Sequence, residues 1–211
     1  MIIAVDGPTA SGKGTIAKAL AAHFGLPHLD TGLLYRAVGR QVELAGGNPD
    51  VPEDALAAVD FDDSVLDDPE LRSEAVGGLA SRVSIHPAVR QALFARQRAF
   101  ATQTGGAVLD GRDIGTVIAP DAAVKLFVTA TVEARATRRF AEMQDSGRAV
   151  TLEEILENLK RRDARDIARK DAPLAAAPEA LVIDTTQLGK EDAIAAALDA
   201  VNTITGQQPC P

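Results

Sequence analysis

The stretch "GPTASGKGTIAKAL", residues 7–20, follows a short apolar run, "IIAV", and a single acid, Asp6. Gly7 and Gly12 flank four residues of this stretch, and Lys13 comes directly after the second glycine. The residues that follow the lysine have the apolar spacing of a helix. The stretch therefore predicts a buried strand, a glycine-rich loop and a helix in direct succession.

This succession is the context in which a P-loop is found. Backbone amides at a helix N-terminus give phosphate oxygens many donors in a small volume, and glycine permits the close approach. Lys13 would then lie against the β and γ phosphates of a nucleotide. A glycine-rich turn without a ligand is the alternative. The predicted ATP-binding residues are Gly7, Pro8, Thr9, Ala10, Ser11, Gly12, Lys13, Gly14 and Thr15.

The position after the lysine departs from the usual P-loop pattern. A serine or threonine is expected there, but this chain has Gly14 and then Thr15. Thr15 is the candidate ligand for the Mg²⁺ of Mg-ATP, either directly or through a water molecule. Asp110, which ends the apolar run "AVLD", is a second candidate in the outer shell of the metal, because ligands bind at the carboxyl ends of strands in open α/β sheets.

Apolar runs alternate with helical patterns along most of the chain. The predicted buried strands are "MIIAV", "GAVLD", "VKLFVTA" and "ALVIDT", with "LPHLD" a weaker candidate. Helical spacing predicts helices over 13–24, 32–45, 132–144, 151–168 and 190–204. This alternation predicts an α/β fold in three layers, with a doubly wound parallel sheet of five strands.

Residues 50–104 interrupt the alternation with helical patterns and no convincing strand. The patterns are "PEDALAAV", "PELRSEAVGGLASRVS" and "PAVRQALFARQRAFATQ", and the acidic connector "DFDDSVLDDPE" joins the first two. We expect a helical insertion carried by a single domain that spans 1–211. The last residues, 205–211, are expected to form a flexible tail.

The composition excludes several classes of function. The chain has 211 residues and a formal net charge of −8, which makes it a poor candidate for wrapping duplex DNA. Its only cysteine, Cys210, cannot form an intrachain disulfide, and this favours a reducing cytoplasm. The chain has no signal-peptide pattern and no apolar run near the roughly 18 residues of a membrane span. We expect a soluble cytoplasmic protein without a nucleic-acid or membrane partner.

Three further stretches narrow the family: "HLDTGLLYRAVG" (28–39), "DGRDIGTVIAPDAAVKLFVTA" (110–130) and "RRDARDIARKDAPL" (161–174). With the loop pattern GxxxxGKGT, they resemble the bacterial cytidylate kinases among the nucleoside monophosphate kinases, and the resemblance runs from residue 2 to about residue 200. It implies a monomeric enzyme that uses Mg²⁺ and transfers the γ-phosphoryl group of ATP to CMP or dCMP. It also implies a nucleotide-binding insertion at about 50–104 and a lid at about 145–170.

The resemblance also implies which residues contact the acceptor nucleotide. They are Thr31, Tyr35, Arg36, Ser81, Arg90, Arg112, Asp113, Arg162, Asp166 and Arg169. A carboxylate beside the 4-amino group of cytosine, with an arginine or hydroxyl near N3, would recognise the base. The resemblance gives this role to Asp113 with Ser81 and Arg90. Uracil would present a carbonyl to the carboxylate and leave buried polar groups unpaired.

Several of these residues have a plainer explanation that the sequence leaves open. Asp30 or Thr31 could cap the helix that follows. Arg112 and Asp113 could pair with each other in a surface turn. For Ser81 and Arg90, the alternative is an exposed position on a helix of the insertion.

Residues 160–170, "KRRDARDIARK", hold six bases against two acids. On a helix, Arg162, Arg165, Asp166 and Arg169 share one face, and a solvated charged face is the usual explanation. Beside a P-loop we favour a lid whose arginines close over the nucleotides and offset developing charge. The predicted catalytic residues are Lys13, Arg162, Arg165 and Arg169. Weaker candidates for ATP contacts are Arg138 and Arg139.

Two competing functions remain at this stage. One is another small-molecule P-loop kinase, acting on uridylate, shikimate or dephospho-coenzyme A. The other is a nucleotide-binding switch that turns ATP over slowly. Many relatives carry a longer, strand-containing insertion where this chain has only "DFDDSVLDDPE", so the preference between CMP and dCMP also stays open.

Overall fold

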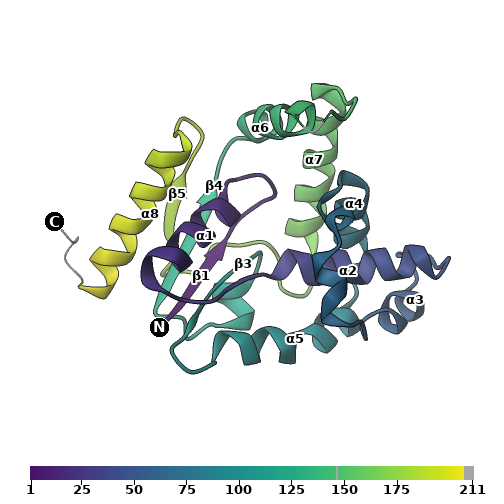
Figure 1. Cartoon of the computed structure of the whole chain (residues 1–211), viewed down its shortest axis with the longest axis horizontal. Coiled ribbons are helices and arrows are strands. Elements are labelled where there is room, and N and C mark those ends of the chain that lie inside the picture. Colours follow the sequence, from purple (N-terminus) through teal and green to yellow (C-terminus); the bar gives the residue numbers. More distant parts are fainter. Residues whose placement is uncertain (146, 207–211) are drawn as a thin grey trace.

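A five-stranded parallel sheet forms the centre of the computed structural model, which describes residues 1–145 and 147–206 (Figure 1). Its strands lie in the order β2-β3-β1-β4-β5. They are β1 (Ile2–Asp6), β2 (His28–Asp30), β3 (Ala107–Gly111), β4 (Val124–Thr129) and β5 (Leu181–Asp184). Val5 pairs with both Asp110 and Leu126, so the central strands end together at one edge. All five predicted strands are confirmed, including the weak candidate.

Helices cover both faces of the sheet, as the alternation predicted. On one face, α1 (Lys13–Phe24) and α8 (Lys190–Thr205) pack against β1, β3 and β4 through one aliphatic cluster. On the other face lie α5 (Pro87–Ala101) and the π-helical turn η3 (Ile114–Ile118). Because the central strands are buried on both sides, their sequences are nearly continuous apolar runs rather than alternating ones.

Helix α2 (Thr31–Leu44) begins directly after β2. Asp30 occupies the N-cap position but makes no capping hydrogen bond through its side chain. The hydroxyl of Thr31 donates instead to the backbone carbonyl of Asp110, with an Oγ1 to O distance of 2.8 Å. Of the two predicted caps, Asp30 is therefore correct by position only, and Thr31 ties α2 to the end of β3.

All the regular elements described between α2 and β3 are helices. It contains α3 (Pro52–Ala57), η1 (Asp63–Asp67), η2 (Pro69–Arg72), α4 (Glu74–Val83) and α5. The pattern "PELRSEAVGGLASRVS", predicted as one helix, breaks at Ser73, because the hydroxyl of this residue accepts from the Val76 amide at 3.2 Å and caps α4. The acidic connector is also more ordered than expected, since it forms η1 and packs Phe61 and Leu66 against neighbouring apolar clusters.

A helical hairpin, α6 (Val132–Asp145) and α7 (Leu152–Ala168), follows β4 at the carboxyl edge of the sheet. Figure 1 shows α7 running from the far end of α6 back toward α4. A capping box between Thr151 and Glu154 fixes the start of α7. The two helices share a small apolar cluster of their own, which includes Ala136 and Leu159.

The chain end differs slightly from the prediction of a tail from residue 205. Thr205 still belongs to α8, and Gly206 ends that helix in the left-handed conformation. Residues 207–211, including Cys210, lie outside the described part of the chain. Among the described helices, none is long and apolar enough to cross a membrane.

Candidate functional site

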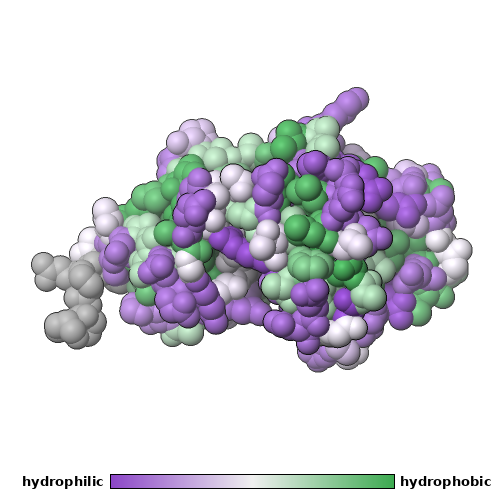
Figure 2. Space-filling view, turned by 90° about the horizontal axis from the view of Figure 1, so that it is seen from above, coloured by the Kyte–Doolittle hydropathy of each residue, from purple (hydrophilic) through white to green (hydrophobic). Residues whose placement is uncertain are grey.

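A cleft of about 660 Å³ opens at the carboxyl edge of the sheet. The loop 9–15, helices α2 and α4, the end of β3 and the α6–α7 hairpin contribute to its wall. Figure 2 shows hydrophilic residues along the hollow between the two halves of the molecule. Basic side chains outnumber acidic ones in the lining, although the whole chain carries a net charge of −8. A cleft of this charge in an acidic protein favours an anionic ligand.

The glycine-rich loop has the geometry of an anion-binding loop at the start of α1. Gly7 passes so close to β4 that a Cβ there would lie 2.0 Å from the carbonyl oxygen of Val128. Gly12, at the N-cap of α1, has a φ of +89°, and Ala10 adopts a φ of +62° although it is not a glycine. Residues 9–15 all line the cleft. The loop therefore presents its backbone to the cleft, as phosphate binding requires.

Lys13 lies at the inner end of this loop. Its Nζ donates to the carbonyl of Pro8 at 3.4 Å, and the side chain lines the cleft. Removal of water from around the ammonium group, with the nearby positive charge of Arg112, lowers the pKa of Lys13 to about 8. A phosphate ligand would supply the missing negative charge. The two predicted ATP-binding residues that do not line the cleft are Gly7 and Pro8, which shape the loop from behind.

The metal candidates, Thr15 and Asp110, both line the cleft. One carboxylate oxygen of Asp110 is hydrogen-bonded to Nε2 of His28 at 2.8 Å. The other carboxylate oxygen of Asp110 faces Gly14 in the loop. A Cβ on Gly14 would lie 3.7 Å from this oxygen, and without a side chain at Gly14 none of the described residues covers the oxygen on that side. Within the described ranges no cluster of three or more acidic, histidine or cysteine side chains is placed to hold a metal. One hydroxyl and one carboxylate oxygen fit Mg²⁺, which keeps several waters and binds substrate phosphates.

A second group of polar residues lies where β3, α4 and α5 meet. Arg90 and Asp113 form an ion pair, and both side chains are almost fully buried. The Arg90 guanidinium also lies over the Tyr35 ring, 5.7 Å from its centroid. The hydroxyl of Ser81 is buried and has no hydrogen-bond partner among the described residues. Burial raises the pKa of Asp113 even though Arg90 opposes this shift.

These positions decide three of the alternatives that the sequence left open. Asp113 pairs with Arg90 and not with its chain neighbour Arg112. Ser81 is 7% exposed and Arg90 is 9% exposed, so neither occupies a solvated helix surface. All three residues predicted to recognise the base therefore line the cleft, and two of them, Arg90 and Asp113, contact each other.

Asp6, for which the sequence predicts no role, supports this group from behind. Its carboxylate accepts from the backbone amides of Ile114 and Gly115, each at 2.8 Å. These amides belong to the first residues of η3, directly after Asp113, where a helical turn offers its own amides no partner. Burial raises the pKa of Asp6 to about 7, against the two backbone hydrogen bonds. The sequence feature that could have indicated this role is the position of Asp6, an acid at the end of the first buried strand and immediately before the loop.

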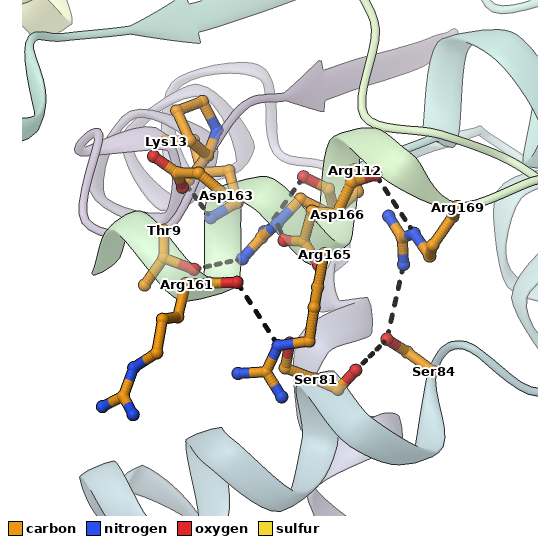
Figure 3. Close-up of polar contacts among 12 residues, drawn as sticks. Thr9, Lys13, Ser81, Ser84, Arg112, Arg161, Asp163, Arg165, Asp166 and Arg169 are labelled. Atoms are coloured by element: carbon orange, nitrogen blue, oxygen red, sulfur yellow. Dashed lines mark hydrogen bonds and ion pairs between the residues drawn. The ribbon is translucent and has the colours of Figure 1, made fainter. Parts of the chain in front are cut away.

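A chain of polar contacts joins the loop to α7 (Figure 3). Nη2 of Arg112 donates to the Thr9 hydroxyl at 2.6 Å, and Nε of the same side chain donates to Asp166 at 3.0 Å. Burial alone would raise the pKa of Asp166, but Arg112 and Arg169 outweigh it and the pKa is lowered. The alternative of a solvated charged face is therefore wrong for Asp166, which is 5% exposed.

A cluster of arginines surrounds the start of α4. Arg162 of α7 is 5% exposed, and its guanidinium lies 3.6 Å from Glu74. Its Nε and one Nη atom are buried without a hydrogen-bond partner among the described residues. Burial and the nearby Arg36 lower the pKa of Arg162 to about 10. Arg139 also pairs with Glu74, at 2.5 Å. Arg139 pairs with Glu142 as well, at 2.9 Å, so two carboxylates lie among Arg162, Arg139 and the nearby Arg36. The cluster keeps an excess of positive charge that an anionic ligand would offset.

The predicted common face of α7 holds only in part. Arg169 lies just beyond the helix end, in extended backbone, and its Nη1 donates to the Ser84 hydroxyl at 3.4 Å. Ser84 in turn donates to the carbonyl of Ser81 at 3.1 Å. Arg165 does not line the cleft; its Nε donates to the carbonyl of Arg161 at 3.4 Å (Figure 3). The structure therefore brings Arg169 into the wall, adds Ser84, and leaves Arg165 outside it.

Beside the glycine-rich loop, the cleft wall is formed by α6 and the loop after β5. Arg138 donates to the Thr185 hydroxyl at 3.0 Å and to the carbonyl of Leu188 at 3.4 Å. The Thr185 hydroxyl donates to the carbonyl of Ser11 at 2.9 Å, so this loop contacts the glycine-rich loop directly. Sequence reasoning missed Thr185. The signal was the polar stretch "DTT" at the carboxyl end of a buried strand.

Comparison with known proteins points to one family. The family model described as cytidylate kinase matches residues 3–203. A cytidylate kinase of Caulobacter sp. (strain K31) is 52% identical over 203 residues, which cover 96% of this chain and 94% of the relative. One of Rhodopseudomonas palustris (strain TIE-1) is 52% identical over 97% of each chain. One of Azorhizobium caulinodans is 52% identical over 98% of this chain and 100% of the relative.

Proposed function

The chain belongs to the cytidylate kinase family, and on that basis we propose that it transfers the γ-phosphoryl group of ATP to CMP or dCMP, yielding ADP and CDP or dCDP. One observation carries the proposal beyond family membership. The cleft has a P-loop at one end and the buried group of Ser81, Arg90 and Asp113 at the other. A donor phosphate site and a site for a polar base thus share one cavity.

The donor occupies the P-loop end in this proposal. The amides of residues 9–15 and the Lys13 ammonium hold the β and γ phosphates. Mg²⁺, bound through Thr15 and through water to Asp110, neutralises part of the charge on these phosphates. Arg138 and Arg139, which both line the cleft, contact the rest of ATP in this proposal.

The acceptor occupies the other end. Asp113 accepts from the 4-amino group of cytosine, while Arg90 and the unpartnered hydroxyl of Ser81 serve the N3 and O2 edge. The Arg162 guanidinium, whose Nε has no hydrogen-bond partner among the described residues, takes the acceptor phosphate together with Arg36. Burial of Asp113 opposes uracil, whose O4 carbonyl would face the carboxylate without a hydrogen bond.

The remaining acceptor contacts require an exchange of partners. Arg112 is bound to Thr9 and Asp166, and Arg169 is bound to Ser84. We propose that CMP draws Arg112 toward its phosphate and that its sugar hydroxyls bind Asp166 and Arg169. Tyr35 and Thr31 complete the wall of the acceptor site from α2.

The reaction needs no general base, because a phosphate monoester has a second pKa near 6 and its oxygens are largely ionised at neutral pH. Catalysis consists of holding two anions in line while Lys13 and Arg162 offset their repulsion. Closure of the insertion (about 50–104) and the lid (about 145–170) over the cleft would exclude water, which otherwise competes as acceptor. The contact of Arg165 with the transferred phosphoryl group stays a prediction that depends on this closure.

A coupled ADP-release assay with ATP and Mg²⁺ tests the proposal, with CMP, dCMP, UMP and AMP offered in parallel. Fast turnover with CMP and dCMP and slow turnover with UMP and AMP is the expected result. Equal rates with UMP would assign a broader pyrimidine kinase. ADP release that no acceptor stimulates would favour the nucleotide switch and contradict the kinase.

A further inference from the structure

Arg135 is a buried arginine that lies behind the cleft wall. It is 4% exposed and belongs to the first turns of α6. Its Nε donates to the carbonyl of Ala130 at 3.0 Å, and its Nη1 donates to the carbonyl of Thr9 at 3.1 Å. The same guanidinium donates two hydrogen bonds to the carboxylate of Asp163 on α7, at 2.6 and 3.2 Å. One planar group thus connects α6, the P-loop and α7.

Thr9 is the common point of two parallel connections to α7. Its hydroxyl accepts from Arg112, which continues to Asp166. Its carbonyl accepts from Arg135, which continues to Asp163, three residues earlier on the same helix. A helix held at two such points, through charge-assisted hydrogen bonds, has a defined rotation relative to the loop.

The two connections differ in their relation to the cleft. Arg112 and Asp166 line it and are proposed contacts of the acceptor, so their mutual contact changes when CMP binds. Arg135 and Asp163 are outside the lining, and no nucleotide needs to displace their contact. Only the second connection can therefore hold α7 to the P-loop in both the ligand-free and the ligand-bound protein.

We propose that the Arg135–Asp163 pair is a positioning unit that fixes α7 against Thr9 and thereby orients Arg162 and Asp166 in the cleft. Arg162 directly precedes Asp163, so a rotation of α7 at Asp163 displaces its guanidinium. The apolar cluster shared by α6 and α7 joins these helices to each other and includes no residue of the P-loop. This inference rests on the proposed phosphoryl transfer and adds two residues to it that touch neither nucleotide.

Loss of the pair has two expected consequences. A displacement of Arg162 by about 1 Å would lower the rate of transfer by about 10²-fold, because in-line geometry is lost. A looser lid would also admit water, so the fraction of ATP that is hydrolysed without transfer to CMP would rise. A purely stabilising contact would change the melting temperature without changing this fraction.

The test compares Arg135→Ala, Asp163→Ala and the double variant with wild type and with a matched control. The control is Arg98→Ala, because Arg98 forms the same kind of two-contact pair with Asp121, at 2.6 and 2.8 Å, and also donates to a backbone carbonyl, that of Ile118. That pair lies outside the cleft lining. For each protein one measures kcat, KM for CMP, ADP release without CMP, and the melting temperature.

The expected result is a fall in kcat of about 10- to 10²-fold in each single variant, a raised fraction of CMP-independent ADP release, and no further loss in the double variant. Arg135→Lys, which keeps the charge but not the two-contact geometry, is expected to behave like the alanine variant. If the alanine variants do not fold, Asp163→Asn, of nearly the same shape, gives the same readout.

Two outcomes would overturn the inference. One is variants that differ from Arg98→Ala only in melting temperature, and the other is a double variant whose loss is the product of the single losses. Failure of the proposed function is a separate result, because wild type itself would then release no ADP in response to CMP.

Discussion

The two ends of the cleft are built in different ways. At the P-loop end, the ligand-binding groups are backbone amides of a loop between β1 and α1. Both of these elements are packed into one extensive aliphatic cluster. At the acceptor end, the groups are side chains, mainly arginines, that come from α2, α4, α5, the end of β3 and the region of α7. Their positions depend on ion pairs such as Arg90–Asp113 and Arg112–Asp166.

This difference suggests a division of tasks. A triphosphate is much the same in every P-loop protein, so a fixed backbone cradle suits it. A base and a sugar must be distinguished from close relatives, and side chains from several elements can be aimed at particular atoms. In our proposal the acceptor end also closes over its ligand, and contacts between separate elements can be exchanged more easily than the contacts within a packed core.

Substitution of Lys13 should impair catalysis with ATP and leave the binding of CMP unchanged. Lys13→Ala removes the positive charge beside the transferred phosphate, and we expect kcat/KM for ATP to fall by about 10³-fold. Binding of CMP without ATP, measured by calorimetry, should stay within about twofold of wild type, because the acceptor residues are untouched. Lys160→Ala, on the exposed side of α7, is the control. An equally large loss of CMP affinity would show that the two ends are not separable.

Asp6 joins the two ends, because it ends β1 and holds the backbone after Asp113. Its pKa is about 7 in the folded protein, against an ordinary value of 3.8. Between these values the folded state keeps a proton that the unfolded state has lost, so the free energy of unfolding falls as the pH rises. From pH 5 to pH 7 the fall due to Asp6 amounts to about 2 kcal/mol.

Urea unfolding of wild type and Asp6→Asn at several pH values measures this contribution. In the variant, the free energy of unfolding should depend much less on pH than in wild type. The dependence that stays is due to Asp113, whose pKa is raised as well. Equal slopes in the two proteins would mean that Asp6 titrates near its ordinary pKa and that its burial does not hinder ionisation.

The attachment of the insertion to the core gives the smallest expected effect. A Cβ on Gly39 of α2 would lie 2.8 Å from that of Leu79 in α4, so Gly39→Ala must push the two helices apart. We expect the free energy of unfolding to fall by about 1–3 kcal/mol. Gly78, one residue away from Leu79, has open space around it, and Gly78→Ala should stabilise α4 by up to about 1 kcal/mol. Thermal unfolding that ranks the two variants in the opposite order would contradict the packing argument.

The P-loop end could be predicted from sequence because its signal is local. The strand, Gly7, Gly12 and Lys13 follow one another within a dozen residues, and their spacing alone specifies the chemistry. The strands were predictable for a related reason: in a sheet covered on both faces, burial makes them continuous apolar runs.

The acceptor end could be predicted only as a set of residues. The resemblance supplied Arg90, Arg112 and Asp113, but their partners depend on tertiary contacts between distant parts of the chain. Helical spacing placed Arg165 beside Arg162, although only Arg162 lines the cleft. The contacts of Asp6 and Arg135 could not be predicted, because both side chains bind backbone groups of other elements.

The most direct test of the account compares kcat/KM for CMP and for UMP in wild type and in Asp113→Asn. Wild type should prefer CMP by at least about 10²-fold, because the buried carboxylate accepts from the 4-amino group and repels the O4 carbonyl of uracil. In the variant, the amide can donate to that carbonyl, so the preference should fall to within about tenfold of equality while turnover with ATP continues. A variant that keeps the full preference for CMP would contradict the claim that Asp113 recognises the base.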